Sequence, residues 1–380
     1  MSNYLKRAIA NEFNHKILPN KVLILLGARR VGKTELINNY LQNIPSESFL
    51  KLNGEDINDA SLLKERSVIN YQRLLLNIDL LVIDEAQIIP DIGLILKLIV
   101  DSIPGIKVIA TGSSVFDLNN KLGEPLVGRK NTVYLFPLAQ IEFAPYENYK
   151  QTAENLEQRL LFGGYPELEQ YTDWEDKKEY LYEIINSYLL KDILIYDGIK
   201  HSNKIYDLLR LIAYQLGKEV SLQELATQLQ MSKNTVSNYL DLLSKVFIIF
   251  KVEGFSRNLR KEIVKSSRWY FYDNGIRNGI ISNFNRLDSR TDVGDLWENY
   301  LASERVKKQN YQKIKVKNYF WRTYDQQELD WLEEIGDYLH GFEFKWNEKK
   351  KAKIPTAFAK AYPDAMFDVI NKSNYLDFIL

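Results

Sequence analysis

The residues most clearly able to do chemistry are a glycine-rich run followed by a lysine and a threonine. Residues 27–34 read GARRVGKT, the full G-x-x-x-x-G-K-[ST] pattern. Glycines let backbone N–H groups curl around phosphate oxygens, the lysine supplies a point charge for the β- and γ-phosphates, and the threonine hydroxyl can ligate Mg²⁺. The pattern predicts an ATP site whose binding residues are Gly27, Ala28, Arg29, Arg30, Val31, Gly32, Lys33 and Thr34.

An acidic pair follows a second apolar run and suits the same site. Residues 79–84 read DLLVID, and Glu85 comes next. We expect Asp84 to hold the metal, directly or through water, and Glu85 to polarise the attacking water. An apolar run that ends in Asp-Glu is weak support alone, but it is strong support after a phosphate-binding loop.

Each of three arginines near this predicted site could have either a catalytic or a structural role. Arg129 precedes the strand-like NTVYLF and could neutralise transition-state charge, in its own chain or in a neighbour. An exposed structural arginine explains the same residue equally well. Arg29 and Arg30 lie inside the loop, where a surface role is favoured over catalysis.

The elements that must position these residues form an α/β core. Residues 21–26 (KVLILL) make a continuous apolar run, the pattern of a strand that is buried on both faces. Residues 79–84 and 106–110 repeat that pattern, and the helical stretch ELINNYLQN follows the glycine-rich loop. We therefore expect a P-loop core with a parallel sheet over residues 1–137.

Length and composition narrow the class of protein. A chain of 380 residues predicts two or three domains. Fifty basic residues balance fifty acidic ones, which excludes a uniformly basic nucleic-acid-binding surface. The absence of cysteine excludes disulfides, thiolate nucleophiles and cysteine-based metal sites, and three histidines disfavour a multi-histidine centre. With no signal-like start and no apolar run near membrane length, we expect a soluble, cytoplasmic protein without membrane contact.

The middle of the chain predicts a helical segment over 138–216 and a winged helix over 217–286. Residues 221–243 carry apolar residues at helix-turn-helix spacing, and Ser232 suits the N-cap of the second helix. That helix would present outward Lys233, Asn234, Thr235 and Asn238. Five basic residues follow, namely Arg257, Arg260, Lys261, Lys265 and Arg268. Contact with DNA phosphates is slightly favoured over a pure packing role.

Residues 287–380 hold a constellation typical of phosphodiester cleavage. Glu343 and Lys345 share one strand face at i, i+2 spacing, and Asp330 on a neighbouring hairpin strand can reach it. We expect Asp330 and Glu343 to bind Mg²⁺ or Mn²⁺ and Lys345 to stabilise charge or help activate water. An ion pair on a solvated face remains the alternative.

These motifs, in order, resemble a family. GARRVGKTELI, LLVIDEAQ, IATGSS, GRKNTVYLFPLAQIEF and LLFGGYPE resemble a widespread group of bacterial and archaeal AAA-type ATPases with a C-terminal domain of unknown function. The resemblance covers essentially the whole chain. It implies a five-stranded parallel sheet with helices on both faces, and a homo-oligomer with sites at subunit interfaces. It also implies that Ser113 senses the γ-phosphate, although an ordinary Ser/Gly turn fits as well.

The resemblance extends to the last third. Residues 287–380 are similar to a PD-(D/E)XK restriction-endonuclease-like core, in which Glu298 matches the acidic, metal-binding residue of the first helix. The usual proline before the first aspartate is absent, because Leu329 stands there. We expect an ATPase whose nucleotide state controls DNA binding and metal-dependent DNA cleavage. The alternative is an ATP-driven regulatory or interaction switch with an inert nuclease-like module.

Overall fold

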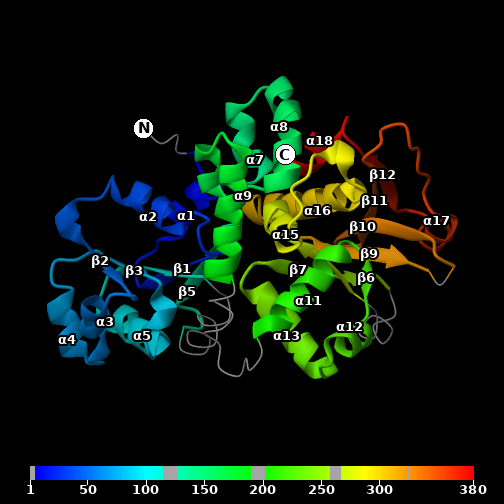
Figure 1. The fold of residues 1–380 in the computed structure, drawn as a ribbon. Helices are drawn as coiled ribbons and strands as arrows, with labels where there is room; N and C mark the ends of the chain where they lie inside the picture. The colour runs from blue at the N-terminus through cyan, green and yellow to red at the C-terminus, as the bar shows by residue number, and fades with distance from the viewer. Residues whose placement is uncertain (1–4, 114–125, 190–201, 257–266, 324) are drawn as a thin grey trace. The chain divides into compact units, whose positions relative to one another are not determined.

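The computed structural model describes residues 5–113, 126–189, 202–256, 267–323 and 325–380. They divide into two compact units (Figure 1). The first unit comprises residues up to Phe136 together with Lys245–Phe247, and the second comprises Pro137–Ser244 and Ile248–Leu380. Each unit is described by itself.

The first unit is built on a five-stranded parallel sheet, as predicted. Its strands lie in the order β2-β3-β4-β1-β5. The central strands are buried because their side chains are apolar on both faces. The strand bounds are β1 (Lys21–Leu26), β2 (Phe49–Asn53), β3 (Leu80–Asp84), β4 (Lys107–Gly112) and β5 (Lys130–Tyr134).

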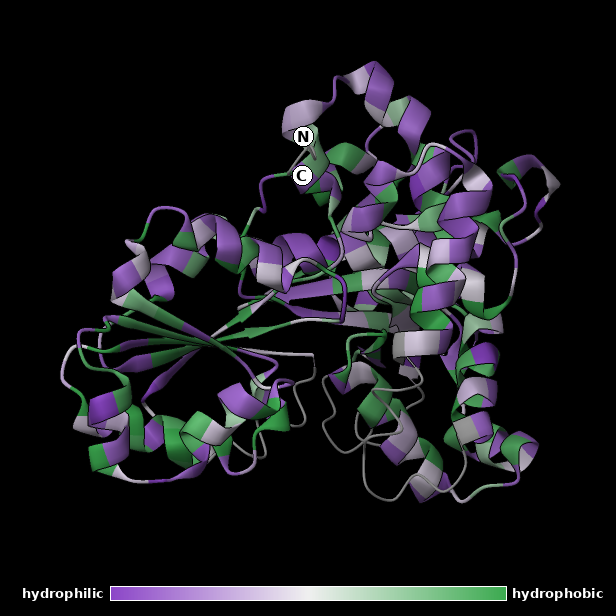
Figure 2. Ribbon diagram, turned by 60° about the vertical axis from the view of Figure 1, so that its left-hand side comes forward, coloured by the Kyte–Doolittle hydropathy of each residue, from purple (hydrophilic) through white to green (hydrophobic). Residues whose placement is uncertain are grey.

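Helices cover both faces of this sheet, again as predicted. In Figures 1 and 2, α1 and α2 lie on one side of the sheet and α3, α4 and α5 on the other. Figure 2 also shows that the strands are largely hydrophobic. The helix bounds are α1 (Ala10–Lys16), α2 (Lys33–Leu41), α3 (Ile57–Lys64), α4 (Val68–Leu74) and α5 (Ile92–Ser102).

The second unit begins with the predicted helical segment. Asn148 caps α8 by accepting a hydrogen bond from the Gln151 backbone N–H, and Gly163 ends that helix with a φ of 75°. The helices are α7 (Gln140–Phe143), α8 (Tyr149–Phe162), α9 (Trp174–Glu183) and α11 (Ser202–Tyr214), with short turns of helix at Ala144–Tyr146, Pro166–Gln170 and Ile184–Leu189.

Two helices and a hairpin follow where the helix-turn-helix was predicted. Ser232 is the cap that the sequence indicated, since its hydroxyl accepts a hydrogen bond from the Thr235 backbone N–H at 3.1 Å. The elements are β6 (Glu219–Val220), α12 (Leu222–Leu229), α13 (Lys233–Lys245), β7 (Ile249–Gly254) and β8 (Ser267–Phe271). Both β6 and β7 pair antiparallel with β8.

The remaining elements complete a second, larger sheet. Seven strands lie in the order β12-β11-β10-β9-β7-β8-β6. The elements are α15 (Asn274–Ile280), α16 (Val293–Tyr311), β9 (Lys317–Arg322), β10 (Glu328–Ile335), β11 (Tyr338–Phe344), α17 (Thr356–Ala361), β12 (Met366–Ile370) and α18 (Tyr375–Ile379).

This sheet differs from the predicted division into a winged helix over 217–286 and a separate domain over 287–380. Strand β7 pairs in parallel with β9, through Glu253↔Tyr319 and Gly254↔Phe320. One core also includes Tyr270 from the first of these regions and Trp297 and Trp331 from the second. The two regions bury their apolar faces together, so the boundary after residue 286 does not separate two cores.

No helix within the described ranges combines the length and the apolar character that crossing a bilayer requires.

Candidate functional site

The glycine-rich loop joins β1 to α2 in a conformation that its glycines make possible. A Cβ on Gly27 would overlap the carbonyl oxygen of Leu135. Gly32 has a φ of 92°, the left-handed region that disfavours side chains. The loop leads directly into the N-terminus of α2, a position that favours phosphate binding.

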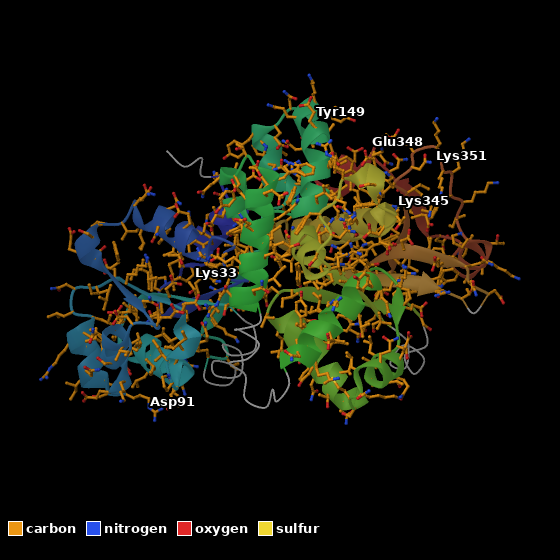
Figure 3. All side chains as sticks on the ribbon, in the orientation of Figure 1. Lys33, Asp91, Tyr149, Lys345, Glu348 and Lys351 are labelled. Carbon is orange, nitrogen blue, oxygen red and sulfur yellow. The ribbon has the colours of Figure 1, made fainter. Side chains whose placement is uncertain are left out.

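Lys33 lies inside the loop rather than in solvent. Its side chain is buried, and its ammonium group donates hydrogen bonds to the carbonyl oxygens of Gly27 at 2.9 Å and Ala28 at 3.0 Å (Figure 3). A buried ammonium group is stabilised when it pairs with an anion. The loop thus holds its positive charge where phosphate oxygens would bind.

The predicted metal ligands Thr34 and Asp84 are in direct contact. The Thr34 hydroxyl donates to Asp84 Oδ2 at 2.8 Å. Asp84 Oδ1 accepts hydrogen bonds from the Thr111 hydroxyl and from the Glu85 backbone N–H, the latter at 3.2 Å. A hydroxyl and a carboxylate side by side suit a hard cation, so these residues fit Mg²⁺.

Glu85 is positioned by a residue that sequence reasoning missed. The Gln87 side-chain amide donates to Glu85 Oε2 at 2.5 Å and to the Ser113 hydroxyl at 3.4 Å. Glu85 itself has a φ of 49°, an uncommon conformation for a residue other than glycine. Ser113 therefore lies within the same group of side chains as the predicted catalytic carboxylate.

Arg7 was also missed, because nothing in the local sequence marks it. Its buried guanidinium donates to the carbonyl oxygens of Val31 and Phe136, both at 2.6 Å. It links the phosphate-binding loop to the segment that follows β5.

The other loop residues divide between the interior and the surface. Ala28 and Val31 are buried. The Arg29 guanidinium lies 4.0 Å from the Glu55 carboxylate, and Arg30 is exposed with a φ of 63°.

Arg129 does not approach the loop of its own chain. It precedes β5, and its backbone carbonyl accepts from the N–H of Val22 at the start of β1. The loop begins after the opposite end of that strand, five residues and roughly 16 Å away at about 3.3 Å per residue. Its guanidinium instead pairs with Asp101 at 2.5 Å. The Arg129 guanidinium and the loop therefore lie at opposite ends of β1. A catalytic role for Arg129 at the loop of its own chain is ruled out by this distance.

In the second unit, the structure gathers the four residues of the predicted nuclease-like constellation. The Lys345 ammonium contacts Glu343 Oε1 at 2.5 Å. Asp330 Oδ2 accepts a hydrogen bond from the Phe344 backbone N–H at 2.8 Å, which fixes it beside β11. Glu298 faces the same cluster from α16.

A guanidinium occupies the middle of this cluster. Arg268 Nη1 lies 3.6 Å from Glu298 Oε1 and 3.8 Å from Asp330 Oδ1, and Nη2 lies 2.9 Å from Glu328 Oε2. The expectation that Arg268 contacts DNA is therefore wrong, since only 4% of its side chain is exposed. The other predicted basic residues, Arg257, Arg260, Lys261 and Lys265, lie outside the described residues.

Burial and like charges raise the pKa values of the acidic side chains. Burial, and then the charge of Asp330, raises the pKa of Glu298 to about 8. Burial also raises the pKa of Asp330 and that of Glu343. Burial alone would lower the pKa of Lys345, but the hydrogen bond to Glu343 more than offsets it.

These residues do not fit the expected metal site. Among the described residues, no three aspartate, glutamate or histidine side chains are grouped so that they could hold a metal ion. Among the described residues, Glu298, Asp330 and Glu343 therefore do not form a three-ligand metal site, and Arg268 lies within 4 Å of two of them.

The exposed face of α13 is polar. Lys233, Asn234, Ser237, Asn238 and Asp241 are exposed, whereas Thr235 is half-buried. Part of this face lines a groove of about 760 Å³, whose other walls come from the start of α12 and from β7 and β8.

Comparison with known proteins identifies the first region. A family model described as an AAA domain matches residues 19–144. Two models described as domains of unknown function, DUF8612 and DUF4143, match residues 153–288 and 293–375.

Similar chains come from archaea and bacteria. The uncharacterized protein MJ1544 of Methanocaldococcus jannaschii is 24% identical over 96% of this chain and 84% of its own. The uncharacterized protein Rv2008c of Mycobacterium tuberculosis is 26% identical over 85% of this chain and 70% of its own. The solved structure of AMPPCP-bound DnaA from Aquifex aeolicus has a TM-score of 0.29 and 15% identity, over 62% of this chain and 86% of that one, a likeness too low to carry an argument. The AAA match and the geometry of the loop agree: residues 19–144 are similar to AAA domains and carry a P-loop.

Proposed function

We propose that this chain hydrolyses ATP with Mg²⁺ at the loop Gly27–Thr34 and uses the nucleotide state as a switch for contact with DNA. The observation that carries the ATPase proposal is the contact of Thr34 with Asp84 beside the lysine-containing loop.

Each residue has a role that its surroundings support. Lys33 exchanges its loop carbonyls for β- and γ-phosphate oxygens, and loop N–H groups bind the remaining oxygens. Thr34 and Asp84 would hold Mg²⁺, which supplies charge neutralisation at the phosphates when bound. Glu85 orients the attacking water, and Gln87 holds the Glu85 carboxylate in place.

Two variants separate binding from hydrolysis. Lys33→Ala should lose both affinity for a fluorescent ATP analogue and release of phosphate. Glu85→Gln should bind the analogue but release phosphate at least tenfold more slowly, because only the step in which water attacks needs the carboxylate. Lys51→Ala removes an exposed lysine of β2 and is the matched control. Hydrolysis that persists at the wild-type rate in Lys33→Ala would refute the proposal.

Two surfaces of the second unit support DNA contact. One is the exposed polar face of α13, which has the composition of a recognition helix. The other is the loop after β11, where Lys349, Lys350, Lys351 and Lys353 are exposed. Figure 3 labels Lys351 in this loop. Lysines at exposed positions attract phosphates without reading sequence.

The test compares the two surfaces across salt concentrations. The pair Lys233→Ala and Asn238→Ala, and separately Lys349→Ala with Lys351→Ala, should weaken binding to duplex DNA and flatten its dependence on salt. Lys178→Ala on α9 is the control. Wild-type binding that does not change with salt would contradict DNA contact through phosphates.

We favour the switch over cleavage for the second unit, because Arg268 already lies within 4 Å of Glu298 and Asp330, two of the three expected metal ligands. No catalytic step is assigned to Asp330, Glu343 or Lys345. A protein that cuts no DNA with Mg²⁺ or Mn²⁺, while still hydrolysing ATP, is the expected result.

We also propose that Arg129 acts on a neighbouring subunit in a homo-oligomer. Its side chain is 41% exposed, and its guanidinium lies too far from the loop of its own chain to act there. Arg129→Ala mixed with Lys33→Ala should recover part of the hydrolysis that each variant lacks alone. The absence of any recovery in a verified mixed oligomer would refute this role.

A further inference from the structure

The acidic cluster of the second unit already contains a cation. Arg268, from β8, contacts acidic side chains from two other elements: Glu298 of α16, and Glu328 and Asp330 of β10. The predicted nuclease-like residues therefore have a positive partner that belongs to the chain itself.

Arg268 is held rigidly in this position. Its guanidinium carbon lies 4.7 Å from the centre of the Phe320 ring, a cation–π contact from β9. Its backbone lies in the middle strand of a three-strand ladder, opposite Glu219 of β6 and Val252 of β7. The guanidinium contacts an aromatic face and three carboxylates, so it cannot move away without breaking several contacts.

The carboxylate oxygens are also engaged elsewhere. The Tyr270 hydroxyl donates to Glu298 Oε1 at 2.7 Å, the same oxygen that lies nearest Arg268. The Phe344 N–H donates to Asp330 Oδ2. Gly217 closes the cluster from another side, since a Cβ there would lie 2.6 Å from Glu298 Oε1.

A divalent ion would have to compete with this arrangement. Hard cations bind carboxylate oxygens at about 2.0–2.6 Å. Arg268 Nη1 lies 3.6 Å from Glu298 Oε1 and 3.8 Å from Asp330 Oδ1, so a divalent ion bound to either oxygen would meet a fixed positive charge.

We propose that Arg268 is the resident cation of this cluster, that the cluster binds no divalent metal, and that it ties β8 to α16 and β10. The second unit then works as a binding module joined into one body by this ion-pair lock. This inference goes beyond the proposed ATPase and does not depend on it, because every contact that carries it lies within the second unit.

The first test measures metal binding by the full chain without nucleotide. Electron paramagnetic resonance of free Mn²⁺ is recorded during titration of the wild type and of Asp330→Asn. Both proteins should leave the same amount of free Mn²⁺, because Asp330 binds none. One additional Mn²⁺ bound per wild-type chain, lost in Asp330→Asn, would overturn the proposal.

The second test asks whether Arg268 and Glu298 act as a pair. Thermal unfolding, followed by tryptophan fluorescence, is compared for Arg268→Gln, Glu298→Gln and the double variant. The shifts of the two single variants should not add up to the shift of the double variant, because Arg268 and Glu298 are in contact. Strictly additive shifts would overturn the lock. If Arg268→Gln fails to fold, the Mn²⁺ titration still decides the proposal.

Discussion

Replacing Glu298 by glutamine should remove a pH dependence from the stability of the second unit. Burial and the charge of Asp330 raise the pKa of Glu298 to about 8, from an ordinary value of 4.5. Between these pH values the folded chain keeps a proton that the unfolded chain releases. The folded state then binds more protons, so the free energy of unfolding falls as the pH rises through this window. The fall is at most about 1.4 kcal/mol for each pH unit.

The assay follows from where the tryptophans lie. All six belong to the second unit, so their fluorescence reports its unfolding alone. Urea unfolding near pH 5.5 and near pH 7.5 should differ by up to roughly 2.7 kcal/mol more in the wild type than in Glu298→Gln. Tyr270→Phe is the matched control. It keeps the carboxyl but removes a hydrogen bond that lowers the pKa of Glu298, so it should keep the dependence. Equal dependence in the wild type and Glu298→Gln would refute the reasoning.

Three further predictions concern single side chains. Arg7→Met should lower the affinity for a fluorescent ATP analogue about tenfold or more, since two buried hydrogen bonds from a charged group hold the loop; unchanged affinity would refute this. Gln87→Ala should lower kcat roughly tenfold in a phosphate-release assay with little change in KM, and a change confined to KM would contradict a positioning role. Burial alone would raise the pKa of Asp292, but hydrogen bonds from Arg290 and Arg277 lower it to about 2. Asp292→Asn should therefore cost about 2 kcal/mol above pH 4, and this cost should disappear as the pH falls through 2 in urea unfolding.

The phosphate-binding loop could be predicted because its chemistry is local. Strand, turn and helix follow one another in the chain, and each backbone conformation there depends on a glycine or an apolar run in the same stretch. Asp84 is 50 residues from Thr34, yet parallel strands bring their carboxyl ends to one edge, so that contact was also predictable. The Ser232 cap followed from the same kind of local rule.

The residues that sequence reasoning missed or misplaced depend on distant partners. Arg7 reaches Phe136 across 129 positions, and no spacing rule connects them. The sequence groups Arg268 with four other basic residues. In the structure it belongs to β8, and its side chain is buried inside the second unit. In the sequence, Arg129 directly precedes β5. Because β5 runs parallel to β1, Arg129 lies at the end of the sheet opposite the phosphate-binding loop. A basic residue can lie on either side of a strand, and only pairing with other strands settles which.

The two acidic clusters show why residue type and spacing do not by themselves define a metal site. Beside the loop, Asp84 is surrounded by hydroxyl and N–H donors, which orient its oxygens but add no positive charge. A cation that arrives there with ATP meets carboxylate oxygens that these hydrogen bonds already orient. In the second unit, Asp330 faces a guanidinium that is fixed by an aromatic ring and by strand pairing. There Arg268 already supplies a positive charge close to Glu298 and Asp330, and this charge repels an arriving cation. Both clusters contain carboxylates, so their number does not tell the two apart. In this chain, a fixed positive charge beside the carboxylates marks a structural ion pair and not a site for metal-assisted chemistry.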